Sequence, residues 1–156
     1  MKMVKIGDFC FEEKWEDRGT CLMYFEADEE YEESAQWSID ISCRKGKYKG
    51  EDVSPSICIN PIDTDKKSVE ELVGIKHVVE NIEECVVRED TFYVFEHEPM
   101  CDYEISVEEL NGDKAHIVGQ GKLVVDGYAD PYTVDDFEID CWVPIILSVD
   151  DWEKFE

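Results

Sequence analysis

Three residue types in this chain could carry chemistry: seven cysteines, three histidines and forty aspartates and glutamates. His97 and Cys101 lie four residues apart, a spacing that converges on an ion in a helix, but this segment is expected to be extended. Zinc sites usually contain a close C-x₂₋₄-C pair, and no two cysteines form one. We therefore expect no metal and seven reduced thiols, at Cys10, Cys21, Cys43, Cys58, Cys85, Cys101 and Cys141.

No catalytic or cofactor signature stands out from the sequence. A G-x-S-x-G nucleophile elbow and a dinucleotide fingerprint are both missing, and His77, His97 and His116 have no recognisable partner. Gly119-Gln120-Gly121 lies within a strand pattern, where glycines usually mark a bulge or a close approach to the neighbouring strand. We expect no cofactor and no catalytic residue. The enzyme alternative would require a deep pocket containing one of the histidines.

The net charge of −25 is the outstanding property of the composition. Such a charge repels nucleic acid and anionic membranes and attracts cationic partners. It also suits a well-solvated surface or a salty cytosol. The N-terminal segment MKMVKIGDF lacks the apolar core of a signal peptide, and no stretch has the ~18 apolar residues of a membrane span. We expect a single domain over residues 1–156 in the cytoplasm.

A β-hairpin over residues 101–125 is the most strongly predicted element, with its turn at Asn111-Gly112-Asp113. Apolar residues occupy odd positions on both strands, and paired residues of neighbouring strands point to the same face. An odd-length loop is needed to bring the two apolar sets together. We predict the loop Leu110-Asn111-Gly112 with a glycine bulge, and one buried face made of Tyr103, Ile105, Val107, Ile117 and Leu123.

Further alternating or β-prone runs predict strands at 3–6, 9–15, 20–26, 36–44, 91–97 and 133–143. Pro144 is expected to end the last of these. The short run 57–59 between Pro55 and Pro61 suits an edge strand or an irregular segment. Ser68 has capping-box spacing for a short helix that ends before Gly74.

Two segments complete the expected fold. Ser148 begins a short C-terminal helix. Residues 75–87 fit a helix or two strands, and we favour strands. The fold class is therefore mainly β, an antiparallel sandwich or a strongly curved sheet with one or two short helices, with α+β as the alternative.

The acidic residues gather in two places that together could form a partner-binding surface. One is the run Glu26, Asp28, Glu29, Glu30, Tyr31, Glu32 and Glu33, with Tyr31 as the expected anchor. The other is the polar face of the C-terminal strands, carrying Asp102, Glu104, Glu108, Asp136, Glu138 and Asp140. These residues form either the solvated side of a sheet or a docking surface for a basic protein.

The run ADEEYEE, the acid-faced strand VDDFEID and the tail SVDDWEKF resemble the small cytosolic immunity or antitoxin-like inhibitors that bacteria pair with nuclease toxins. The resemblance implies a non-catalytic protein whose carboxylates pair with the active-site lysines and arginines of a toxin and neutralise it. The alternative is an intracellular binding or scaffold domain of unknown ligand, in which the charge serves solubility only.

Overall fold

The computed structural model describes residues 3–15, 19–26 and 34–155 of the chain. It is mainly β, with 63% of residues in strands, as the sequence predicts. The strands are β1 (Met3–Ile6), β2 (Phe9–Phe11), β3 (Glu13–Lys14), β4 (Cys21–Phe25), β5 (Ala35–Cys43), β6 (Gly46–Tyr48), β7 (Glu51–Val53), β8 (Ser56–Thr64), β9 (Lys76–Val79), β10 (Thr91–Tyr93), β11 (His97–Asn111), β12 (Lys114–Asp126) and β13 (Thr133–Ile146). The helices are α1 (Ile82–Arg88) and the 3₁₀ helices η2 (Val69–Leu72) and η3 (Val149–Phe155).

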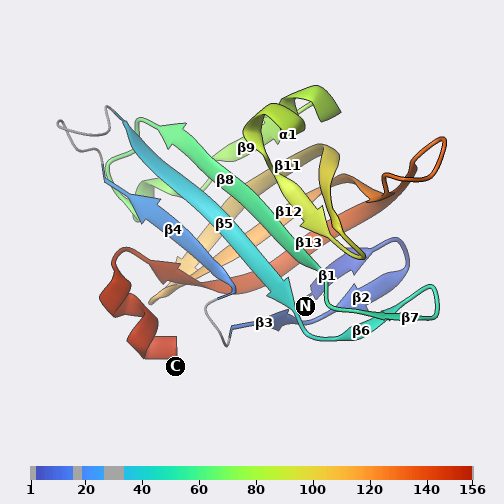
Figure 1. Cartoon of the computed structure of the whole chain (residues 1–156). Coiled ribbons are helices and arrows are strands. Elements are labelled where there is room, and N and C mark those ends of the chain that lie inside the picture. The colour runs from blue at the N-terminus through green and yellow to red at the C-terminus, as the bar shows by residue number, and fades with distance from the viewer. Residues whose placement is uncertain (1–2, 16–18, 27–33, 156) are drawn as a thin grey trace.

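Seven strands close into a barrel in the order β12-β11-β10-β8-β5-β4-β13, and β13 returns to pair with β12 (Figure 1). The expectation of a sandwich is therefore wrong. The sheet closes because β13 is long enough to pair with β12 along most of its length and with β4 at its far end. That last pairing is parallel, through Leu22–Ile145 and Met23–Ile146. β1 and β2 extend the sheet outside the barrel.

The hairpin of β11 and β12 is confirmed, but its loop differs from the prediction. Asn111 pairs with Lys114, so the loop contains only two residues, with Gly112 at φ 64°. A two-residue loop alone would send the two apolar sets to opposite faces. A register shift between Val107 and Glu109 restores the alignment, because it inserts one extra residue into β11. The five predicted apolar residues are all buried, as expected of a shared inner face.

Two prolines that the sequence analysis placed at the ends of strands lie inside strands. β8 is nine residues long and pairs with β5 and β10, so it is not the predicted edge strand. Pro61 is tolerated there because the register with β5 shifts between Trp37 and Ile39, and this shift places a bulge at the proline. Pro144 does not end its strand: β13 continues to Ile146, where it reaches β4.

Residues 75–87 divide into the strand β9 and the helix α1, so the preference for strands alone is half right. β9 and β10 pair with successive parts of the same long strand, β11. α1 lies in the connection between β9 and β10. Its N-cap Asn81 accepts a hydrogen bond from the Glu84 backbone N–H at 2.9 Å, and Glu89 ends it in the left-handed conformation.

The inner faces of the barrel strands form one continuous hydrophobic core. Trp37, Phe92 and Ile105 are among its largest fully buried side chains, and the Phe92 ring packs on Phe137 with centroids 5.2 Å apart. The two predicted short helices are present as the 3₁₀ helices η2 and η3. The barrel therefore supplies a rigid base for the polar side chains that point outward from it.

Candidate functional site

Four of the predicted acidic residues lie side by side on the outer face of β11, β12 and β13. Strand register places Asp102, Lys122 and Asp136 in one row across the three strands. A second row contains Glu104, Gln120 and Glu138. Strands are spaced by ~4.8 Å and alternate residues by ~6.8 Å, so the Cα atoms of the four acidic residues lie at the corners of a rectangle of about 10 by 7 Å.

β9 supplies a wall beside these rows. Val78 pairs with Glu104 across β9 and β11, and Glu80 follows at the end of β9. Together the rows and the wall enclose an open hollow of about 580 Å³. We call it the acidic groove, lined by Val78, Val79, Glu80, Asp102, Tyr103, Glu104, Gln120, Gly121, Lys122, Asp136, Phe137 and Glu138.

The groove is strongly negative because five carboxylates line it beside a single cation, Lys122. Glu104 has two neighbours: it accepts a hydrogen bond from the Gln120 side-chain amide at 2.9 Å, and the Lys76 ammonium lies 3.6 Å from its other oxygen. Glu80, Asp136 and Glu138 are exposed. Such a surface can accept hydrogen bonds from lysine and arginine side chains of another protein.

Two glycines allow β11 and β12 to approach closely beneath the groove. Tyr103 pairs with Gly121, and the sequence analysis expected a bulge or a close approach to the neighbouring strand at this Gly-x-Gly segment. A Cβ atom on Gly121 would lie 2.2 Å from the Asp102 carbonyl oxygen and 2.7 Å from the Tyr103 Cα. The missing side chain therefore lets the backbones approach closely beside Asp102, which follows a bulge in β11.

The other predicted binding residues do not join the groove. Glu26 lines a separate hollow beside Tyr24 and Lys66. Glu108 lies further along β11 and accepts a hydrogen bond from the Ser106 hydroxyl at 2.6 Å. The residues Asp28, Glu29, Glu30, Tyr31, Glu32 and Glu33 lie outside the described part of the chain.

Asp140 lies two residues after Glu138 on the same strand, but its side chain contacts a histidine outside the groove. The His116 Nε2 lies 2.7 Å from its carboxylate, within hydrogen-bond distance. The His116 ring also stacks on Trp142, with centroids 5.1 Å apart. The sequence analysis found no partner for this histidine because the pairing crosses from β12 to β13. His97 is exposed and contacts Tyr93 beside another open hollow.

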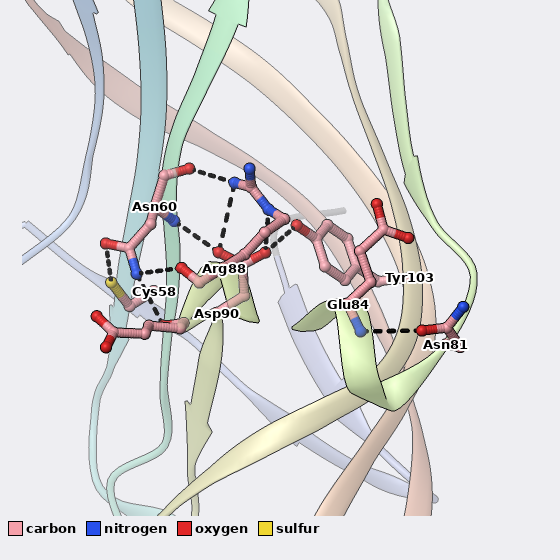
Figure 2. A network of polar contacts seen from close by, with 8 residues as sticks. Cys58, Asn60, Asn81, Glu84, Arg88, Asp90 and Tyr103 are labelled. Carbon is pink, nitrogen blue, oxygen red and sulfur yellow. Dashed lines mark hydrogen bonds and ion pairs between the residues drawn. The ribbon is translucent and has the colours of Figure 1, made fainter. Parts of the chain in front are cut away.

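A buried polar network lies between β8, α1 and β11 (Figure 2). Asp90 at its centre is completely buried and accepts hydrogen bonds from the Tyr103 hydroxyl at 2.5 Å, Arg88 Nε at 2.7 Å and the Asn60 backbone N–H at 2.9 Å. Arg88 also donates to the Asn60 carbonyl at 2.6 Å. Burial and the hydrogen bond to Asp90 raise the pKa of Tyr103, so its hydroxyl remains a donor.

This network lies beside the shortest strand of the barrel, β10. β10 joins β8 to β11 over only three residues, and Asp90 immediately precedes it. His77 on β9 lies beside the network, with its ring 5.7 Å from that of Tyr103 and its Nε2 buried without a hydrogen-bond partner. No local sequence pattern predicted this network, because Arg88-Glu89-Asp90 reads as an ordinary charged loop.

Four of the seven cysteines are buried in the structure. All seven lie within the described residues, and none of them is joined in a disulfide. Burial raises the pKa of Cys21, Cys43, Cys58 and Cys85 to about 12, which leaves them protonated near neutral pH. Among the described residues, no group of three or more His, Cys, Asp or Glu side chains is arranged to hold a metal ion.

Comparison of the chain with protein-family models, with curated proteins and with solved structures finds no match. No helix in the described part of the chain is long and apolar enough to cross a membrane. The functional assignment must therefore rest on the site itself.

Proposed function

We propose that this protein binds a cationic protein partner through the acidic groove, as an immunity-type inhibitor would cover the lysines and arginines of a toxin's active site. The single observation that carries this proposal is the convergence of five carboxylates on one hollow, from the strands β11 and β13 and from the residue that follows β9. The two strands β11 and β13 carry the acidic residues that the sequence indicated for this role.

The spacing of the carboxylates favours an extended partner segment. Asp102 and Glu104 are two residues apart on one strand, and Asp136 and Glu138 are two apart on another. Basic residues at alternate positions of an extended chain repeat every ~6.8 Å, which matches this spacing. Val78, which is 47% exposed, offers an apolar contact at the wall of the groove.

Binding of a defined basic peptide tests the proposal. The probe is a fluorescent ten-residue peptide of alternating arginine and threonine, titrated with the protein while anisotropy is measured at physiological salt. The double variant Glu104→Gln/Glu138→Gln should raise the Kd by about 2- to 30-fold, because each exposed ion pair contributes ~0.2–1 kcal/mol. A peptide with the same composition but five consecutive arginines should bind less tightly to the parent protein.

A matched control separates the groove from the general negative charge. Glu51 and Glu153 are exposed and lie on β7 and η3, away from the groove. The variant Glu51→Gln/Glu153→Gln also removes two negative charges and should leave the Kd nearly unchanged. Equal weakening by the two double variants would show that the peptide responds only to net charge, and the scaffold interpretation would then replace this proposal.

A further inference from the structure

Two exposed tyrosines lie at the end of the hairpin formed by β12 and β13. The connection over residues 127–132 projects beyond the barrel, in orange at the upper right of Figure 1. Tyr128 is 83% exposed and Tyr132 is 49% exposed, and Val134 at the start of β13 is 47% exposed. We call these three residues the tyrosine tip.

The conformation of the connection does not depend on the tyrosine rings. The Tyr128 backbone N–H donates to the Asp126 carboxylate at 2.9 Å, and the Asp126 N–H donates to the Thr133 hydroxyl at 3.1 Å. Within the described residues, neither ring stacks on another aromatic side chain. The exposed parts of both rings are therefore available for a partner.

Carboxylates crowd the base of the tip. Asp126 and Asp130 flank Tyr128 in the chain, and both are exposed. Glu98 approaches so closely that a Cβ atom on Gly127 would lie 2.2 Å from its Oε2. Burial, then the nearby charges of Glu96 and Asp126, raise the pKa of Glu98. In the described part of the chain, no lysine or arginine forms an ion pair with these carboxylates.

The tip is continuous with the acidic groove along β13. Val134 precedes Asp136 by two residues and points to the same face of the strand. Six residues separate Tyr132 from Glu138, which is about 20 Å of extended chain, and a ten-residue partner segment spans about 33 Å. One extended segment can therefore contact the groove and the tip together.

We propose that the tyrosine tip stacks against guanidinium groups of the partner, so that the whole docking surface prefers arginine to lysine. This inference rests on the proposed binding function of the groove. A planar guanidinium stacks on aromatic faces and is more weakly hydrated than an ammonium group, whereas a carboxylate surface alone attracts both cations. Aromatic rings among unpaired carboxylates therefore favour arginine.

The test compares two peptides of equal charge and length, one of alternating arginine and threonine and one of alternating lysine and threonine. The parent protein should bind the arginine peptide about 5- to 30-fold more tightly, as expected for two exposed cation–π contacts. In Tyr128→Leu/Tyr132→Leu this ratio should fall to about 2 or less, and the Kd of the lysine peptide should stay unchanged. Phe25→Leu, an exposed aromatic on β4, serves as the control and should retain the full ratio.

The possible failures are distinguishable. Equal affinities of the parent protein for the two peptides, or an arginine preference that survives in the double leucine variant, would overturn the role of the tip and leave the groove in place. Failure of the parent to bind either peptide, or unchanged binding in Glu104→Gln/Glu138→Gln, would overturn the groove itself and this inference with it.

Discussion

Among residues of its size, Asp90 is the one whose replacement should lower the free energy of unfolding most. Its side chain is completely buried and accepts hydrogen bonds from Tyr103, Arg88 and Asn60. Asp90→Ala removes the counter-charge of Arg88, whose side chain is only 21% exposed, and leaves the other two donors unpaired. Removing one partner of a buried ion pair costs about 3–5 kcal/mol, so the free energy of unfolding should fall by that amount.

Tyr103→Phe should cost less, because Asp90 keeps its two other donors. One hydrogen bond to a charged group contributes about 1.5–3 kcal/mol, which sets the expected loss. The two substitutions share this hydrogen bond, so the loss in the double variant Asp90→Ala/Tyr103→Phe should be smaller than the sum of the single losses by at least about 0.5 kcal/mol.

Urea unfolding followed by tryptophan fluorescence measures these losses, since Trp37 is fully buried in the core. Asp65→Ala is the matched control: this carboxylate is 92% exposed, and its replacement should change stability by less than about 0.5 kcal/mol. A domain of this size has about 5–15 kcal/mol of stability, so Asp90→Ala should remain folded in buffer wherever the parent's stability exceeds the expected loss. If Asp90→Ala loses no more stability than Asp65→Ala, the network does not hold the barrel together.

Two further predictions concern titrating side chains. Burial, then the charge of Arg88, lowers the pKa of His77 below its ordinary value of 6.5. The unfolded chain therefore binds a proton more readily, and stability should fall as the pH drops below about 6.5; this dependence should weaken in His77→Phe, and an unchanged pH profile in that variant would contradict the assignment. Among the thiols, Cys10 is exposed and should be alkylated first at pH 8, while Cys21, Cys43, Cys58 and Cys85, whose pKa burial raises to about 12, should react only on unfolding. Titration in denaturant without reductant should find seven thiols, and fewer would indicate a disulfide.

The hairpin of β11 and β12 shows which features of the fold the periodicity of the sequence predicts and which it does not. Alternation correctly identified β11, β12 and their shared buried face, because side-chain direction alternates strictly along a strand. The loop was predicted wrongly because one compensating residue can be inserted anywhere in either strand. Here it lies at the register shift between Val107 and Glu109. Local pattern thus determines which residues are buried, and the place of the bulge depends on packing.

Closure of the barrel depends on contacts that no local pattern contains. The ring closes through the parallel pairing of Leu22 with Ile145, residues more than a hundred positions apart. The strands that carry these two residues would be apolar in a sandwich as well as in a barrel. The sequence therefore could not distinguish the two folds. The same limit applies to Asp90: a charged residue between Arg88 and a strand reads as exposed, and only the fold reveals that it is buried.

The candidate site was predicted in part, for a reason that lies in β12. Alternation placed Asp102, Glu104, Asp136 and Glu138 on polar faces, and the structure brings them together because β12 pairs with both strands that carry them. Glu80 was missed because the segment around it fitted a helix or two strands, and the strand interpretation alone did not place it beside β11. Its place in the groove follows from the pairing of β9 with β11.

Glu26 and the carboxylates of the acidic groove lie near opposite ends of β13. Glu26 follows β4, and β4 pairs with β13 at Ile145 and Ile146. Asp136 and Glu138 lie eight to ten residues earlier on β13, or about 26–33 Å along the strand. A single short partner segment seated in the acidic groove therefore does not also contact Glu26. It follows that charge reversal at Glu26 should leave peptide binding to the groove nearly unchanged, whereas charge reversal at Glu138 should weaken it.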